Sequence, residues 1–403
     1  AGVQAARKRV DAAAMRVPQA ASLEDPMLDV NGWPFYPHVP QTAGGRMTVE
    51  MMVAQDVPWF GKLDTKAAAA EEEVNAARAQ LAAEELKTVA DVRLAYYDLY
   101  FVQRALTVTH QERDILADLI QVALVLYQTG RTSQQDVLRL QAELSNVDGE
   151  LIRLEQSRAA AQADLAQVLH ISPETPLAAR EHLSPEDVPR DLDALYRQAI
   201  TSRPELHAVL AELQREQRNV DLARLEYFPD ATFRFGWGEM TTNRALAPMA
   251  DGVDSLTVGL SVNLPVYRRR LDAGVREAEA MVVATARQYD QLRDETQRDV
   301  KRLFTLVHSQ REQETLFRES IIPKTQQALD VAVRGYQVGD TDFADLIASW
   351  RELLRFRIAH LRLEVQLRQT LASLERVLGG IAAESSLPPS PQPADLPPLP
   401  LPE

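Results

Sequence analysis

The chain has 403 residues, of which 45% are hydrophobic and 25% charged, and its formal net charge is −14. This composition excludes a wholly disordered or collagen-like chain. The acidity, without any run of lysine and arginine, argues against nucleic acid as a partner. The sequence contains no cysteine, which excludes disulfides, thiolate metal sites and cysteine nucleophiles.

Residue types that carry out chemistry are sparse. The seven histidines lack the spacing of metal ligands. No Ser/His/Asp set, phosphate-binding loop or glycine-rich dinucleotide motif occurs, so we expect no enzyme, no cofactor and no bound metal. No stretch approaches the roughly 18 to 20 uninterrupted apolar residues of a membrane-spanning helix.

The first half of the chain, residues 1–170, is predicted to form a helix, a β-hairpin and two long helices. The chain begins at Ala1 within a segment that is already helical in pattern, and we expect that its start is missing. A hairpin is predicted at about 29–57. Long helices follow over 63–170, and the absence of a helix breaker between Leu63 and the turn near Tyr127 predicts a continuous helix of about 100 Å.

Apolar residues in these helices recur at alternating steps of three and four, which is the a/d pattern of helices that pack lengthwise against one another. The clearest seam consists of Val137, Leu140, Leu144, Val147, Leu151 and Leu154. A seam of smaller residues is predicted at Leu63, Ala67, Ala70, Val74, Ala77 and Leu81. Such long helices cannot form a compact globule alone, so we expect them to bundle with further helices.

The second half begins after a proline-rich linker at 171–191 and covers residues 192–380. A second hairpin is predicted at about 230–265 and helices at 268–380, with Pro323 expected to interrupt the helical run. The tail at 381–403 is dominated by proline and leucine, and we expect it to be extended or disordered.

The predicted strands alternate apolar and small polar residues. From Leu256 to Leu264, every second residue is apolar. This pattern is typical of a strand with one face in lipid and one in water, and also of a half-buried strand in a soluble protein. Two hairpins make too small a sheet to close by itself. We therefore expect the hairpins to meet copies from other subunits or to decorate the end of a bundle.

The two halves repeat one another. Tyr127–Gly130 is followed six residues after the glycine by Asp136, and Tyr336–Gly339 is followed at the same spacing by Asp345. The segments just before the two long helices also resemble each other, and the number of residues between corresponding positions of the two halves is nearly constant. Ordered landmarks at a constant offset indicate an internal duplication.

This order of elements resembles that of the TolC-like outer membrane efflux proteins, and the resemblance covers the whole chain except the tail. It implies a mainly α fold with a small β part, in which three chains build an α-barrel across the periplasm and a transmembrane β-barrel in the outer membrane. Gln55–Lys62 and Ala95–Tyr100 are similar to the members that serve heavy-metal efflux pumps.

The resemblance implies a passive exit duct of a tripartite efflux system, carrying metal cations or, as the second choice, drugs. Its implied partners are two further copies of the chain, a periplasmic adaptor protein, an inner-membrane pump and outer membrane lipid. The competing interpretation is a soluble coiled-coil scaffold or adaptor. That alternative explains the seams and the acidity, but not the hairpins at corresponding places in both halves.

The two Tyr-x-x-Gly turns are implied to lie at the periplasmic tip and to dock the adaptor. The residues concerned are Tyr127, Gly130, Arg131, Gly339 and Asp340. Glycine permits the left-handed backbone that ends one helix before the next begins. The alternative is that these turns are ordinary connectors between helices.

By the same resemblance, Asp345 matches the family position that lines the constricted pore entrance. Asp345, joined by Asp342, is implied to form an acidic ring in a trimer, which would attract cations. The alternative for each aspartate is a negative charge that favours the N-terminus of a helix.

The resemblance also implies that Asp136 and Tyr336 hold the periplasmic tip closed, through hydrogen bonds between neighbouring helices. The arginine that the family carries two residues after the second glycine is absent here, where Thr341 stands. We expect Arg334 or Arg131 to substitute for it in the closing contact. For Asp136 the helix N-terminal role is an equally open interpretation.

Overall fold

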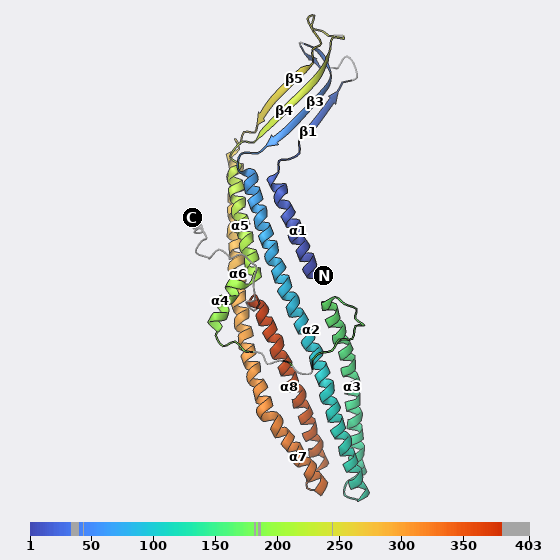
Figure 1. The fold of residues 1–403 in the computed structure, drawn as a ribbon. Coiled ribbons are helices and arrows are strands. Elements are labelled where there is room, and N and C mark those ends of the chain that lie inside the picture. The colour runs from blue at the N-terminus through green and yellow to red at the C-terminus, as the bar shows by residue number, and fades with distance from the viewer. Residues whose placement is uncertain (34–39, 43, 181–182, 184–186, 244, 381–403) are drawn as a thin grey trace. The chain divides into compact units, whose positions relative to one another are not determined.

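The computed structural model describes residues 1–33, 40–42, 44–180, 183, 187–243 and 245–380. The tail predicted for 381–403 and parts of the predicted linker lie outside these residues. The described chain is mainly helical with one small antiparallel sheet (Figure 1). Within the described residues, no helix combines the length and the apolar character needed to span a membrane.

The chain forms both helices and strands, with the following bounds. The helices are α1 (Gly2–Ala21), α2 (Lys62–Gln128), α3 (Gln134–Leu169), α4 (Leu192–Ser202), α5 (Pro204–Leu225), α6 (Arg268–Leu316), the π-helical turn η1 (Phe317–Ile321), α7 (Ile322–Val338) and α8 (Phe343–Val377). The strands are β1 (Met27–Gly32), β2 (Gln41–Thr42), β3 (Gly45–Val57), β4 (Ala231–Thr241) and β5 (Ser255–Val262). The principal strands thus lie in the two predicted hairpin intervals, except that β1 begins two residues earlier.

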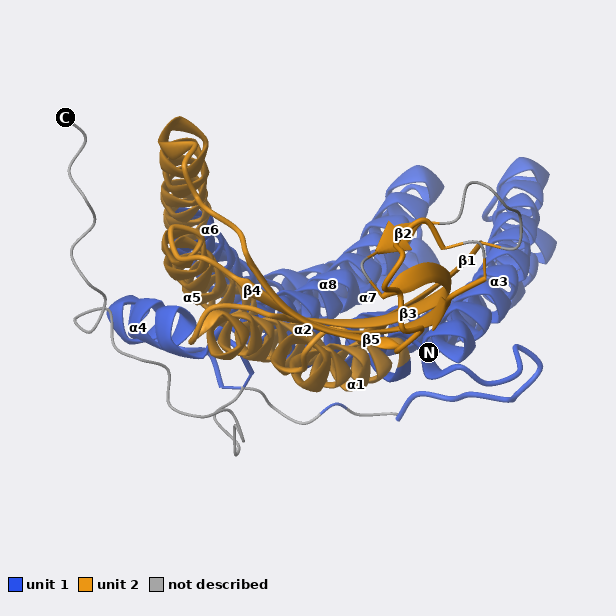
Figure 2. Ribbon diagram, turned by 90° about the horizontal axis from the view of Figure 1, so that it is seen from above, with its two compact units in different colours: residues 1–4, 82–204, 292–390 blue, residues 5–81, 205–291, 391–403 orange. Residues whose placement is uncertain are grey.

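Figure 2 shows the two compact units into which the chain separates. Among the described residues, the helical unit, in blue, comprises 1–4, 82–204 and 292–380, and the sheet unit, in orange, comprises 5–81 and 205–291. Each unit combines segments from both halves of the sequence, so the compact units do not coincide with the two repeats.

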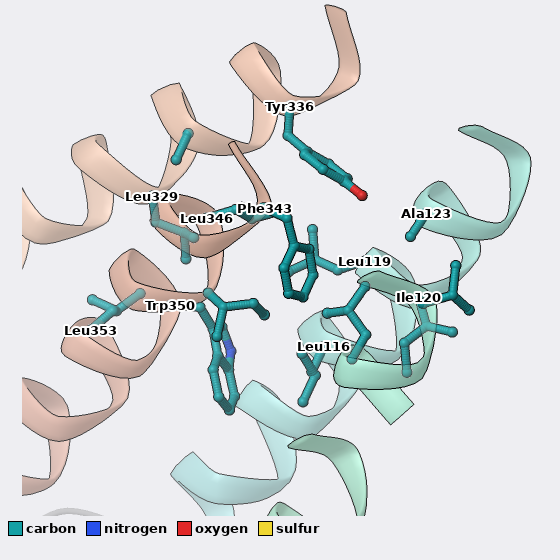
Figure 3. Packing of buried hydrophobic residues seen from close by; sticks show 14 of the residues in the cluster. Leu116, Leu119, Ile120, Ala123, Leu329, Tyr336, Phe343, Leu346, Trp350 and Leu353 are labelled. Atoms are coloured by element: carbon teal, nitrogen blue, oxygen red, sulfur yellow. The ribbon is translucent and has the colours of Figure 1, made fainter. Parts of the chain in front are cut away.

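The helical unit is held together by a core in which α2, α3, α7 and α8 meet. Trp350, Leu346 and Leu353 of α8 are almost completely buried there (Figure 3). The heptad seam of α3 contributes to the cores of this unit: Val137, Leu140, Val147 and Leu151 are buried, and Leu144 and Leu154 are half-buried. The a/d pattern therefore predicted the packing face of α3 correctly.

The predicted seam of small residues at the start of α2 lies on a partly buried face. Val74 is buried and the other five members are half-buried, while Ala76 and Ala79 are buried outside the predicted seam. An alanine-rich helix presents small apolar side chains on every side, so the spacing of its alanines does not single out one stripe.

The long helical run of the second half is interrupted close to Pro323, as predicted. α6 ends at Leu316, the π-helical turn η1 follows, and α7 begins at Ile322. Proline has no N–H to donate and its ring crowds the carbonyl group four residues earlier, which a locally widened turn accommodates. α2 contains no proline and runs unbroken for 67 residues.

The sheet has the strand order β1-β3-β4-β5, with β2 beside β3, and every pairing is antiparallel. Residues that lie directly opposite one another on antiparallel strands point to the same face. One such row across the four strands is Leu28, Val53, Phe235 and Val258. The neighbouring row, on the other face, is Asp29, Met52, Gly236 and Thr257. The register thus separates an apolar face from a polar face.

The apolar face of the sheet is exposed in the single chain. Val258 is 78% exposed and Phe235 53%. Other exposed members of this face are Val30, Met51, Phe233, Trp237, Leu256, Leu260 and Val262. The alternation predicted from Leu256 onward is therefore confirmed, and the face that it defines is uncovered over its whole width.

A buried lysine ties the start of α2 to the start of β4 within the sheet unit. Lys62 Nζ lies 2.9 Å from Asp230 Oδ2 and 3.3 Å from Glu226 Oε1. The backbone N–H of Trp59 donates to Asp230 Oδ1, and the Trp59 ring stacks on Phe228 with 5.3 Å between centroids. These contacts fasten the end of one hairpin to the beginning of the other.

Candidate functional site

The candidate site consists of the two turns that join α2 to α3 and α7 to α8, here called the tip turns (residues 127–136 and 336–345). Gly130 and Gly339 have φ values of 73° and 92°. This left-handed conformation is strained for residues with a side chain, so glycine is required at both positions. At the second turn, the N–H groups of Gly339 and Asp340 donate to the Gly335 carbonyl oxygen at 2.9 and 2.8 Å, which closes the end of α7.

Thr341, at the position where the family carries arginine, folds back against α7. A Cβ atom at Gly335 would lie 2.0 Å from Thr341 Oγ1. The absence of a side chain at Gly335 therefore makes room for the threonine. The second tip turn is consequently a tight, self-packed loop rather than one from which a long basic side chain extends.

Asp136 belongs to a capping box at the start of α3. Its backbone N–H donates to Ser133 Oγ at 3.2 Å, and the Ser133 N–H donates to Asp136 Oδ2 at 3.3 Å. This reciprocal pair satisfies backbone donors that the first turn of a helix leaves without partners. The helix N-terminal interpretation of Asp136 is therefore correct.

The same carboxylate also takes part in a contact between the two tip turns. The Thr132 hydroxyl group donates to Asp136 Oδ2 at 2.9 Å and lies 3.1 Å from the Tyr336 hydroxyl oxygen. Since Thr132 uses its proton on the carboxylate, Tyr336 is the donor in the second bond. A relay from Tyr336 through Thr132 to Asp136 thus connects α7 with the α2–α3 turn.

The hydrogen-bonded relay is surrounded by apolar side chains. Tyr336 is 6% exposed, and its ring lies edge-to-face with Phe343, with 6.2 Å between the centroids. Figure 3 shows Tyr336 and Phe343 pointing from α7 and α8 toward the side chains of α2, among them Leu119. Both aromatic rings are therefore buried where the two tip turns meet.

The pKa values of the two end groups favour the relay at neutral pH. Burial opposes ionisation of Asp136, but the hydrogen bonds from Ser133 and Thr132 outweigh it and hold the pKa of this carboxyl below its usual value. Burial, together with the charges of Asp136 and Asp342, raises the pKa of Tyr336. Tyr336 is thus a protonated donor and Asp136 an ionised acceptor.

Within the chain, the structure does not bring Arg334 into the closing contact as predicted. Arg334 Nε donates to the Asp330 carbonyl oxygen on its own helix at 3.1 Å, and both Arg334 and Arg131 are exposed. The neutral hydroxyl group of Thr132 bridges Tyr336 and Asp136 instead. Sequence reasoning missed Thr132 because it looked for a charged partner. Its spacing, two residues after Gly130, is the signal that could have revealed it.

The two acidic residues at the start of α8 are exposed. Asp342 is the N-cap residue, with an extended backbone and no side-chain capping hydrogen bond, and Asp345 lies in the first turn. Leu346 and Ile347, which follow Asp345, face the core. Both carboxylates therefore point away from the packed helices and are accessible to solvent and cations.

A bidentate ion pair farther along α8 was not predicted. Arg351 Nε and Nη2 donate to Glu143 of α3 at 2.9 and 2.5 Å. The hydrogen bonds from Arg351 hold the pKa of the Glu143 carboxyl below its usual value. This pair joins the α7–α8 hairpin to the α2–α3 hairpin, as the Tyr336 relay does. No cluster of three or more metal-binding side chains occurs among the residues that the structure describes.

Two helical hairpins that end in glycine turns, together with a sheet that exposes an apolar face, are the features of a membrane channel. The chain belongs to the outer membrane efflux protein family, whose model matches residues 2–169 and 195–380. It is therefore an efflux protein of the outer membrane, and its duplicated helix and hairpin architecture is that of TolC-like channels.

Similarity to individual proteins extends over most of the chain. The cobalt-zinc-cadmium resistance protein CzcC of Cupriavidus metallidurans is 23% identical over 94% of this chain and 86% of its own length. The outer membrane efflux protein BepC of Brucella suis is 23% identical over 74% of this chain and 64% of its own length.

Solved structures share the fold. A structure of CusC superposes with a TM-score of 0.79 at 17% identity, over 94% of this chain and 89% of that chain. The outer membrane protein VceC from Vibrio cholerae gives a TM-score of 0.75 at 19% identity, over 93% and 92% of the two chains.

Proposed function

We propose that this protein is one of three identical subunits of a passive exit duct, which receives its cargo from a periplasmic adaptor and an inner-membrane pump. The observation that carries this proposal is the incomplete sheet. β1 and β5 are its edges, and no further strand pairs with either among the described residues. Open edges beside an exposed apolar face are unstable in water and impossible in lipid unless they are paired.

Copies of the chain supply the missing partners. Each chain contributes four principal strands, β1, β3, β4 and β5, so three chains would contribute about 12 strands, an even number within the range of outer membrane barrels. Pairing β5 of one subunit with β1 of the next would leave no edge. The apolar row with Val258 would then face lipid, and the polar row with Thr257 would face the water-filled interior.

The tip turns fit the role of a gate in such a duct. The Tyr336–Thr132–Asp136 relay and the Glu143–Arg351 pair hold the two hairpins of one subunit together, so they favour a closed tip. Docking of an adaptor against the turns at Tyr127–Arg131 and Gly339–Asp340 would open the tip by separating these hairpins. The energy for transport would come from the pump, because a passive duct carries no catalytic site.

Metal cations are the cargo that we propose. The relative CzcC, which is similar over nearly the whole chain, is named for resistance to cobalt, zinc and cadmium. Exposed carboxylates of Asp342 and Asp345, repeated three times around a pore, would attract cations and repel anions. Drug export is the second candidate, since wide ducts discriminate little between solutes.

The soluble scaffold remains the competing function from another class. It accounts for the long helices but leaves the uncovered apolar face of the sheet without a purpose, because large exposed apolar patches mark interaction or membrane surfaces. Under that alternative, the sheet would have to be covered by a partner protein in water.

One preparation distinguishes these functions. Membranes from cells that express the full chain are extracted with detergent, and the protein is measured by light scattering and electron microscopy. We expect an elongated particle of three chains that requires detergent. A monomer or dimer that stays in aqueous buffer would refute the duct. For the cargo, restored resistance to zinc, cobalt and cadmium, but not to drugs, in a strain lacking its own outer membrane metal channel is the expected result.

A further inference from the structure

Strands β3 and β5 leave the sheet at the same end. β3 ends at Val57 and β5 at Val262, and both residues lie opposite Ala231 at the start of β4. After a few residues each strand is followed by a long helix, α2 or α6, which begins within the sheet unit (Figure 1). Because the helices of an outer membrane efflux protein lie in the periplasm, this end of the sheet is the one nearer the periplasm.

Exposed aromatic side chains follow both strands at this end. Phe60, after β3, is 85% exposed, and Tyr267, after β5, is 76% exposed. Leu264 and Val266 are exposed as well, and they continue the alternation of the apolar face beyond the end of β5. Aromatic residues gather at the water interfaces of outer membrane barrels, because their rings suit the boundary between acyl chains and headgroups. This end of the sheet therefore has the composition of a membrane interface.

Three consecutive arginines follow Tyr267 directly. Arg268, Arg269 and Arg270 are exposed, and none of them forms an ion pair with another residue that the structure describes. Arg268 lies over the ring of Tyr227, with 5.4 Å between its guanidinium carbon and the ring centroid. Three basic residues are fewer than the roughly five to eight of a typical nucleic-acid-binding tract. The cluster is therefore a local excess of positive charge at the end of the sheet.

The three arginines occupy an unfavourable place in their helix. They form the first turn of α6, which contains no acidic residue, and the positive end of the helix dipole disfavours cations and favours anions there. The corresponding position of the first repeat differs, because Lys62, at the start of α2, is buried and paired with Asp230 and Glu226. No carboxylate of the described residues pairs with the arginines in this way, so an anion from outside the chain would stabilise them.

We propose that Arg268–Arg270 bind the phosphate groups of anionic phospholipids in the periplasmic leaflet of the outer membrane. This inference rests on the proposed function, which places the apolar face of the sheet against lipid. The rings of Phe60 and Tyr267 then lie at the boundary of the acyl chains, and the arginines lie just beyond it, at the headgroups. Guanidinium groups bind phosphate oxygens through paired hydrogen bonds, and basic residues beside a membrane are attracted to anionic lipids. The contact fixes the depth of the sheet in the membrane.

Two matched triple variants test the proposal. The first replaces the three arginines with glutamine (R268Q/R269Q/R270Q), and the control removes three positive charges from α1 (R7Q/K8Q/R9Q), about 18 Å or more along that helix from its end near the sheet. Each purified full-length protein is mixed in detergent with equal amounts of phosphatidylglycerol and phosphatidylcholine, and the lipids that stay bound are counted by native mass spectrometry.

We expect the wild-type protein and the control to retain phosphatidylglycerol in preference to phosphatidylcholine. The arginine variant should lose at least about tenfold of this preference, because each arginine beside an anionic surface contributes a factor of roughly five. A variant with lysine at all three positions (R268K/R269K/R270K) keeps the charges and should keep most of the preference, which separates the loss of charge from a failure to fold.

Several outcomes would overturn the lipid site. An arginine variant that retains phosphatidylglycerol as the wild type does, or a control that loses it equally, would refute it. Displacement of the lipid by excess inorganic phosphate would make it a site for free phosphate. An arginine variant that no longer forms trimers, with its lipid preference unchanged, would assign the arginines to a contact between subunits. A monomeric wild-type protein would refute the duct, whereas its lipid preference, measured on the same sample, still decides the role of the arginines.

Discussion

Replacing Tyr336 with phenylalanine removes the hydroxyl group through which α7 hydrogen-bonds to the α2–α3 turn. The ring stays packed against Phe343 in its buried position, so the substitution isolates the 3.1 Å bond to Thr132. Tyr336 is the donor of this bond, and the half-buried Thr132 keeps its own bond to Asp136. The substitution therefore leaves no buried donor without a partner, and its effect should measure the hydrogen bond itself.

In the proposed trimer, three copies of this bond act together. A neutral hydrogen bond contributes about 1 kcal/mol, so breaking one in each subunit should shift the equilibrium between closed and open tips by about 3 kcal/mol, or roughly a hundredfold. The open fraction in planar bilayers reports this shift directly. Tyr127→Phe is the matched control, because Tyr127 occupies the corresponding position of the first repeat but is 43% exposed.

A double-mutant cycle with Thr132→Val completes the test. If the relay is real, Tyr336→Phe should add little once Thr132 is valine, because the bond has already been lost. An open fraction of Tyr336→Phe within about twofold of wild type, or full additivity with Thr132→Val, would refute the relay as a contact that holds the tip closed.

Three further predictions follow from the described contacts. Asp345→Ala should move the reversal potential of the reconstituted channel toward lower cation selectivity, and an unchanged potential would place Asp345 away from the pore. Lys62→Met should lower the free energy of unfolding by about 2 kcal/mol in thermal unfolding, because it leaves Asp230 without its buried cation; a loss restored by Asp230→Asn would confirm the pairing. Val258→Lys should reduce the amount of assembled protein in membranes, at a cost of about 2–4 kcal/mol if this face contacts lipid. Thr257→Lys, on the opposite face, should be tolerated, and equal losses for both would argue against the assignment of faces.

Local sequence signals determined the elements of this protein. The alternation from Leu256 onward predicted the apolar face of β5, because residues two apart on a strand share one side. The heptad steps from Val137 to Leu154 predicted the packing face of α3, and Pro323 predicted the interruption between α6 and α7. Gly130 and Gly339 predicted the turns, because other residues rarely adopt a left-handed backbone.

The duplication in the sequence also predicted which segments correspond, and with the resemblance it indicated the family. It could not predict which side chains meet between segments. Thr132 and Tyr336 are brought together only when the α2–α3 turn lies beside α7, and Glu112 meets Arg357 only when α2 packs against α8.

At the alanine-rich start of α2, spacing alone does not select one buried stripe, because small apolar side chains surround that helix and its neighbours decide which of them are most buried. Arg334 was proposed from charge, whereas the fold placed the hydroxyl group of Thr132 at Tyr336. The sequence by itself thus determined the helices, strands and turns, through backbone preference and periodicity. Only the tertiary structure decided the contacts that hold the tip turns together, since these depend on distances between residues remote in sequence.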